Sequence, residues 1–151
     1  MLIKDNSKNI ECLLKQYEIC VNMADKISER RGNANKFYSA LLLAFLSAIT
    51  AFITKNLYEY YPVLLILLVL QITLCIIWIV SLNTYKNLNK AKFDVINEME
   101  NNLLVQAYTL EWKYFKKYQT ITISRIEISI PIVFILASIS IIIYILMDVF
   151  A

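Results

Sequence analysis

Between Tyr60 and Tyr85 the chain reads YYPVLLILLVLQITLCIIWIVSLNTY and carries no charged side chain. Two further runs share this property, Phe37 to Thr54 and Ile128 to Met147. A helix needs about 20 mostly apolar residues to cross about 30 Å of hydrocarbon, because in lipid every backbone amide must find its partner within a helix or a closed barrel. Three such runs predict a polytopic membrane protein of the all-α class.

The composition points the same way. The 151 residues are 59% hydrophobic and only 18% charged, and the mean hydropathy is +0.56. These values are not those of an ordinary soluble domain. The net charge of +3 is mixed in sign along the chain, so it does not supply the concentrated basic stripe that binds nucleic acid. We therefore expect one membrane domain over residues 1–151, with the lipid bilayer as a partner and no nucleic acid.

The distribution of Lys and Arg predicts the topology. Seven of these residues lie in the first 36 positions, seven lie in residues 83–125, and Lys55 lies between the two groups. Cytoplasmic loops accumulate Lys and Arg near the ends of spans. The N-terminus and the middle segment are therefore expected in the cytoplasm of a bacterium, with the loop at 55–59 and the C-terminus outside its inner membrane.

Aromatic residues are expected at both membrane interfaces. The outer group is Tyr58, Tyr60 and Tyr61, and the inner group is Trp112, Tyr114, Phe115 and Tyr118.

Apolar periodicity predicts helices in the polar segments. Residues 10, 14, 17, 21 and 24 form an amphipathic stripe, which packs on a neighbouring cytoplasmic helix or forms a coiled-coil seam between subunits. Gly32, the only glycine, can end or bend this helix, and a continuous helix into the membrane is the alternative. The expected elements are a cytoplasmic helix over 8–31, spans over 37–54, 61–84 and 126–147, and a long cytoplasmic helix over 85–117.

Small side chains recur on one face of the first predicted span. In lipid such a face lets helix backbones approach closely. It serves either packing within one subunit or an oligomer seam or pore wall between subunits. Its members are Ala40, Ala44, Ser47, Ala48 and Ala51.

Two positions place polar groups in or beside the spans. Gln71 lies near the middle of the second run, where its amide must hydrogen-bond across helices or face water. Glu127 opens the third span two residues after Arg125. This carboxylate can pair with Arg125, cap the helix electrostatically, or contribute to a gating ring made by several subunits.

Residues for familiar chemistry are missing. The chain has no histidine, which excludes histidine acid–base catalysis and mixed Cys/His metal sites. One glycine cannot build a phosphate-binding loop, and the spacing of Cys12 and Cys20 is not that of metal ligands. We expect no enzyme activity, no cofactor and no metal.

Four ordered blocks carry a resemblance to a known family. They are Ile27-Ser28-x-Arg30-Arg31-x-x-Ala34-Asn35, Leu88-Asn89-x-Ala91-Lys92-Phe93, Ile96-x-Glu98-x-Glu100, and Ile126-Glu127 with Pro131. Together with Tyr85 and Trp112, they resemble the RipA family of bacterial membrane proteins. This resemblance implies a small inner-membrane protein that assembles as a homo-oligomer, an octamer, with no established biochemical activity. The family is expected to have proline after the position of Leu103, where this chain has Leu104. The resemblance therefore does not imply a break in the cytoplasmic helix at this position.

The layout is also similar, more distantly, to SLATT modules, which are proposed pore-forming effectors. Two functions follow as expectations. The first is a homo-oligomeric pore or channel, of the kind a stress or antiviral effector uses. The second is a non-conducting membrane scaffold that organises cytoplasmic or envelope partners.

Overall fold

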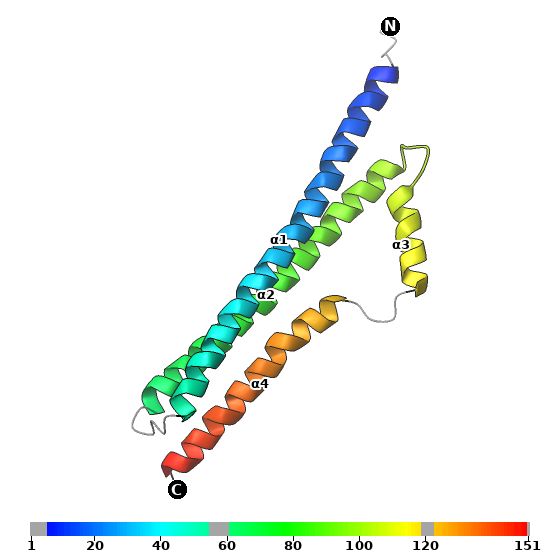
Figure 1. Ribbon diagram of the computed structural model, residues 1–151. Coiled ribbons are helices and arrows are strands. Elements are labelled where there is room, and N and C mark those ends of the chain that lie inside the picture. Colours follow the sequence, from blue (N-terminus) through cyan, green and yellow to red (C-terminus); the bar gives the residue numbers. More distant parts are fainter. Residues whose placement is uncertain (1–5, 55–60, 119–122, 151) are drawn as a thin grey trace. The chain divides into compact units, whose positions relative to one another are not determined.

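The described residues of the computed structural model, 6–54, 61–118 and 123–150, form four helices (Figure 1). The helices are α1 (Asn6–Thr54), α2 (Tyr61–Glu100), α3 (Ala107–Tyr118) and α4 (Ile123–Phe150). Three of them, α1, α2 and α4, contain windows long and apolar enough to cross a membrane. The predicted all-α class with three spans is confirmed. The expected outer loop over 55–59, with Lys55, Tyr58 and Tyr60, lies outside the described residues.

The helix α1 passes through Gly32 without a break. A methyl group placed on Gly32 would meet no atom within 4 Å, so this glycine does not serve a close approach of two helices within the subunit. Of the two possibilities that the sequence left open, the structure has the continuous helix. The lone glycine costs local helix stability but is too weak a signal to end a helix that continues on both sides.

The helix expected over 85–117, whose continuity the sequence left open, is interrupted in the structure. The helix α2 ends at Glu100, residues 101–106 are not helical, and α3 starts at Ala107. The last turn of α2 closes with tight i to i−3 bonds, from the amide of Asn102 to Met99 O at 3.1 Å and from the amide of Leu103 to Glu100 O at 3.0 Å. Two consecutive asparagines, which are poor helix formers, follow Glu100 and favour this end.

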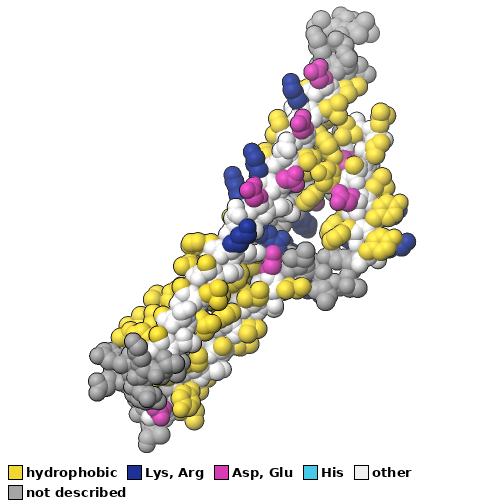
Figure 2. Space-filling model, in the orientation of Figure 1, with side chains coloured by type: hydrophobic (Ala, Val, Ile, Leu, Met, Phe, Trp, Pro, Cys, Tyr) yellow, Lys and Arg dark blue, Asp and Glu magenta, His cyan; other side chains and the backbone are white. Residues whose placement is uncertain are grey.

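The chain divides into two compact units. Unit 1 contains residues 1–31 and 84–122, and unit 2 contains residues 32–83 and 123–151. Charged side chains gather on the first part of α1 and around the α2–α3 turn, whereas the spans present mainly hydrophobic side chains (Figure 2). Unit 2 therefore holds the membrane-spanning segments, and unit 1 holds most of the charge.

The buried face of α2 in unit 2 repeats every three or four residues. Its members are Leu64, Leu68, Gln71, Cys75, Trp78 and Leu82. All of them except Gln71 belong to two apolar clusters, one around Leu42 with Cys75, Trp78 and Leu82, and one around Ile49 with Leu64, Leu68 and Ile145. A 3.5-residue repeat is the pattern of helices that pack side by side at a shallow angle.

The core of unit 1 is smaller. Ala24 and Ile27 of α1 and Ile96 of α2 are buried, whereas Ile10 and Leu14 are about half exposed, at 52% and 49%. The amphipathic stripe of α1 is thus covered within the subunit only at its end nearer the span.

Candidate functional site

The three spans are joined by a polar cluster centred on Asn35. The amide of Asn35, on α1, accepts a hydrogen bond from Trp78 Nε1 on α2 at 2.9 Å and donates one to Glu127 Oε1 on α4 at 2.9 Å. Tyr38, one turn further along α1, stacks on Trp78 with ring centroids 5.8 Å apart and shares a 3.1 Å hydrogen bond with Ser81. We call these five residues the Asn35 cluster. One side chain of α1 therefore fixes the register of both other spans.

A hydrogen bond also joins two spans at the opposite end of unit 2. Tyr61 Oη on α2 donates a 2.7 Å hydrogen bond to Asp148 Oδ2 on α4. The spans are thus held by polar contacts at both ends and by the two apolar clusters between them. Tyr61 lies at the start of α2, and its position at the outer membrane interface stays a prediction.

Gln71 and Ser138 place polar atoms within this otherwise apolar region. Gln71 is 3% exposed, and its Oε1 has no hydrogen-bond partner among the described residues. Of the two predicted roles of the Gln71 amide, a cross-helix hydrogen bond or contact with water, its oxygen accepts no cross-helix hydrogen bond from the described residues. Ser138 is 2% exposed, and its hydroxyl donates to Phe134 O of its own helix at 2.8 Å.

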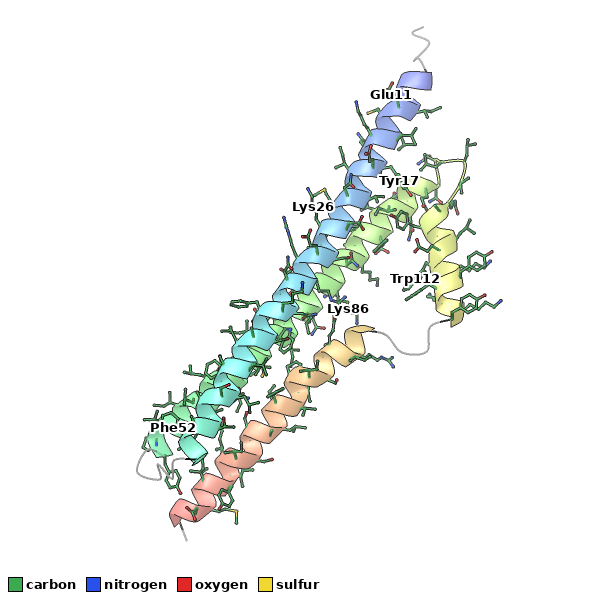
Figure 3. The ribbon with its side chains drawn as sticks, viewed as in Figure 1. Glu11, Tyr17, Lys26, Phe52, Lys86 and Trp112 are labelled. Atoms are coloured by element: carbon green, nitrogen blue, oxygen red, sulfur yellow. The ribbon has the colours of Figure 1, made fainter. Side chains whose placement is uncertain are left out.

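A second polar cluster, in unit 1, is centred on the buried carboxylate of Glu100. It accepts hydrogen bonds from Tyr17 Oη at 3.0 Å, from the backbone amides of Tyr108 at 2.8 Å and Thr109 at 3.1 Å, and from Thr109 Oγ1 at 2.9 Å. We call these four residues the Glu100 cluster. Figure 3 shows Tyr17 on α1 beside the turn between α2 and α3. A carboxylate at the end of α2 thus caps the N-terminus of α3, where unsatisfied amides favour negative charge.

Burial and hydrogen bonding shift the pKa values of Glu100 and Tyr17 in opposite directions. Burial by itself raises the pKa of Glu100, but the amides of Tyr108 and Thr109 and the hydroxyls of Thr109 and Tyr17 outweigh it and hold this pKa below its usual value. Burial, together with the hydrogen bond to Glu100 and its negative charge, raises the pKa of Tyr17 to about 12. Glu100 is therefore ionised and Tyr17 neutral at physiological pH.

The predicted small-residue face of α1 is left open by its own subunit. Ala40, Ala44, Ser47 and Ala51 are exposed and Ala48 is half-buried. Packing of this face within one subunit, the first of the two alternatives, is not what the structure has. The Ser47 hydroxyl donates to Leu43 O at 2.8 Å, so its polar group is satisfied by its own helix.

The exposed faces of the other two spans are different in character. On α2 and α4 they carry mainly bulky apolar side chains. Examples, each at least 59% exposed, are Ile66, Val80, Val133, Leu136 and Tyr144. Bulky apolar side chains suit lipid contact, whereas small ones suit contact with another helix.

A model of the Octameric membrane protein family (8xMP) matches residues 14–147, nearly the whole chain. The chain belongs to this family. No curated protein and no solved structure gives a significant match. Membership makes the chain a homo-oligomeric membrane protein, the assembly that the sequence resemblance implied. The RipA name and the likeness to SLATT modules stay predictions.

The predicted motif residues of this octameric membrane protein separate into the two clusters and the surface. Asn35 and Glu127 meet in the Asn35 cluster, and Glu100 centres the other. Tyr85, Asn89, Lys92 and Arg31 are half-buried, whereas Arg30, Glu98, Trp112 and Arg125 are exposed. Sequence reasoning missed Tyr17, Tyr108 and Thr109, because their role depends on the turn after Glu100.

Metal binding finds no support in the part of the chain that the structure describes. No group of three or more Cys, Asp or Glu side chains there can hold a metal ion. Cys12 is exposed, Cys20 is half-buried and Cys75 is buried, and all three are free thiols.

Proposed function

We propose that this octameric membrane protein forms a pore, in which the small-residue face of α1 makes the contacts between subunits and the wall of the channel. The observation that carries the proposal is a difference between spans: α1 exposes four small residues along one face, whereas α2 and α4 expose mainly bulky apolar side chains and only scattered small ones such as Ala137. The small residues of α1 are Ala40, Ala44, Ser47 and Ala51, and its span exposes Leu43 and Leu46 as well. A ring of subunits needs one face for its neighbours and another for lipid. Small residues on α1 suit the first, because they let backbones approach closely.

Under this proposal the N-terminus and unit 1 lie in the cytoplasm of a bacterium and the spans cross its inner membrane. The support is the bias of Lys and Arg, which places all but Lys55 in the first 36 residues or in residues 83–125. The assembly conducts rather than catalyses.

The experiment uses a matched pair of substitutions, Ala44→Leu on α1 and Ala137→Leu on α4. Both alanines are exposed on spans, and both changes add the same apolar volume. Native mass spectrometry of the purified protein is expected to show an intact octamer for Ala137→Leu and smaller species for Ala44→Leu. The reverse result would place the seam on α4 and overturn the proposed contact.

Conduction is measured on the same proteins in sealed liposomes. Wild-type octamers and Ala137→Leu are expected to release a trapped ion, whereas Ala44→Leu is expected to release much less. Intact wild-type octamers in liposomes that stay sealed across membrane potentials and salt gradients would overturn the pore.

A scaffold is the second candidate, and the exposed apolar residues of unit 1 favour it. Ile19 is 56% exposed, and Met23, Leu88 and Val95 are each at least 44% exposed. A scaffold binds a cytoplasmic protein through this surface without changing permeability. It predicts that Lys92→Glu or Glu98→Lys removes a co-purifying protein while the octamer stays intact. Glu100 is unsuitable for this test because it is buried.

A further inference from the structure

The helix α3 exposes an unusual set of side chains. None of its residues is buried, and its C-terminal half presents Trp112 at 54%, Tyr114 at 61%, Phe115 at 46% and Tyr118 at 75% exposure. Bulky hydrophobic side chains gather along the visible face of α3 in Figure 2. Aromatic residues exposed at this density need an environment that is partly apolar.

The lysines of α3 occupy one side of the helix. At 100° per residue, Lys113, Lys116 and Lys117 fall within one arc, while the five aromatic residues fall within the arc beside it. Lys116 Nζ lies 5.3 Å from the centre of the Trp112 ring, and Lys117 Nζ lies 5.8 Å from that of Tyr118. With Glu111 as the only acid in α3, the helix carries an excess of positive charge. An aromatic face beside a lysine face is the pattern of helices that lie in a membrane interface.

Within unit 1, α3 runs back from the end of α2. From Thr84, at the end of the charge-free run, α2 rises for about 24 Å to Glu100. The helix α3 turns back from there (Figure 1), and its twelve residues can return about 17 Å. The Glu100 cluster holds this turn in place. Within unit 1, the lysine end of α3 therefore returns along the direction of Thr84, the residue near the end of the charge-free run.

We propose that α3 binds the anionic phospholipid surface of the membrane that the protein spans. The aromatic side chains Trp112, Phe115 and Tyr118 enter the headgroup layer, and the three lysines bind lipid phosphates. Charge complementarity selects this occupant, because the three lysines of α3 are cationic and lipid phosphates are anionic, while its aromatic rings suit the boundary between headgroups and hydrocarbon. The inference goes beyond the proposed pore and does not depend on it, because a scaffold would bind the lipid equally.

The first test counts lipids on the purified octamer. The protein is extracted from vesicles of equal amounts of phosphatidylcholine and phosphatidylglycerol, and the retained lipids are identified by mass spectrometry. The triple variant Lys113→Gln, Lys116→Gln, Lys117→Gln is compared with a control that removes the same charge from exposed sites on α1 and α2, Lys15→Gln, Lys26→Gln, Lys90→Gln. Each lysine near an anionic surface contributes roughly fivefold to binding. The α3 triple is therefore expected to lower the preference for phosphatidylglycerol by up to about 100-fold.

The control triple is expected to keep that preference, and a third variant with arginine at the three α3 positions is expected to keep it too. If the α3 triple retains the lipid as the wild type does, or if both triples lose it equally, α3 is not the lipid site and the proposal is overturned.

The second test reads the position of α3 directly. The chain has two tryptophans, and Trp78 is 2% exposed, so acrylamide quenching of the intrinsic fluorescence reports mainly on Trp112. In nanodiscs that contain phosphatidylglycerol, Trp112 is expected to be shielded compared with nanodiscs of phosphatidylcholine alone. The shielding disappears in the lysine triple. Equal quenching in the two kinds of nanodisc would overturn the proposal even if the lipid counts agree with it.

Discussion

Tyr17 Oη donates a 3.0 Å hydrogen bond to Glu100 Oε1 across 83 positions of the chain. This contact ties the N-terminal part of α1 to the turn at which α2 ends and α3 begins. The same carboxylate accepts the amides of Tyr108 and Thr109, so a single ionised group organises three helices of unit 1. Hydrogen bonds to charged groups contribute more than neutral ones, which makes Glu100 the most sensitive position of this unit.

We predict that Glu100→Gln loosens α3. The neutral amide keeps one oxygen for the donors but loses the charge that suits a helix N-terminus, at a cost of about 1–3 kcal/mol. Hydrogen exchange at the amides of α3 is expected to accelerate, with little change in the spans. Glu98→Gln is the control, because Glu98 is exposed and two residues away. Equal exchange rates in both variants would contradict a capping role for Glu100.

The depressed pKa of Glu100 predicts a loss of stability in acid. Because the folded-state pKa lies below the unfolded value of about 4.3, the contribution is complete above that value. It is lost as the pH falls through the folded pKa. Exchange of the α3 amides measured from neutral to acidic pH is expected to show this loss in the wild type and not in Glu100→Gln. If the wild type and Glu100→Gln show the same pH profile, the acid-dependent loss of stability does not come from Glu100.

Tyr17 provides an alkaline counterpart. Its pKa is raised to about 12, from an ordinary value of about 10, so the neutral phenol contributes stability below pH 10 that is lost as the pH rises through about 12. Burial and the charges of Asp25, Glu111 and Glu100 also raise the pKa of Tyr108. Ultraviolet titration of the ten tyrosines is therefore expected to lose a late transition, the one near pH 12, in Tyr17→Phe. If the late transition persists in Tyr17→Phe, it belongs to another tyrosine.

The outcome for the fold shows what sequence patterns can establish. Charge-free runs predicted three spans because the requirement of lipid for apolar residues is local and strong. The end of α2 was missed because the apolar stripe through Val95, Met99 and Leu103 continues the helical period across the break. The end of the helix also involves a tertiary contact, in which the Glu100 carboxylate caps α3. The apolar periodicity of the sequence gives no indication of that contact.

The candidate sites were predictable to a similar extent. Asn35 and Glu127 were singled out separately, by motif and by position, yet their 2.9 Å hydrogen bond needed the three-dimensional arrangement of α1 and α4. The small-residue face of α1 was visible as a repeat, but only the structure shows that its own subunit leaves the face open.

For the Asn35 cluster, we predict that Asn35→Ala lowers the stability of the spans by about 1–3 kcal/mol, because it leaves Trp78 Nε1 and Glu127 Oε1 without their present partner. Unfolding of the detergent-solubilised protein by a denaturing detergent measures the change. Asn33→Ala serves as the control, because Asn33 is exposed on the same helix. In a Trp78→Phe background the effect of Asn35→Ala is expected to shrink, and an unchanged effect would show that the two side chains are not coupled.

Gln71→Leu is predicted to leave the subunit's stability unchanged or to raise it. The buried Oε1 has no partner among the described residues, and an apolar side chain of similar size removes that unsatisfied acceptor. The same denaturing-detergent assay applies, with Gln71→Ala as the control that removes the amide and leaves a cavity. A clear loss of stability in Gln71→Leu, under conditions where the octamer dissociates first, would mean that the oxygen does have a partner within the subunit.

The continuity of α1 gives the last prediction. Gly32 lies inside a helix with open space around its Cα, so Gly32→Ala is expected to stabilise the protein by about 0.5–1 kcal/mol. Gly32→Pro is expected to destabilise it by about 3 kcal/mol, because proline removes an amide from the helix and clashes with the preceding turn. A helix that ended at this glycine would respond in the opposite sense to alanine and would tolerate proline nearby. Thermal unfolding of both variants, followed by circular dichroism, therefore distinguishes a helix that continues through Gly32 from one that ends there.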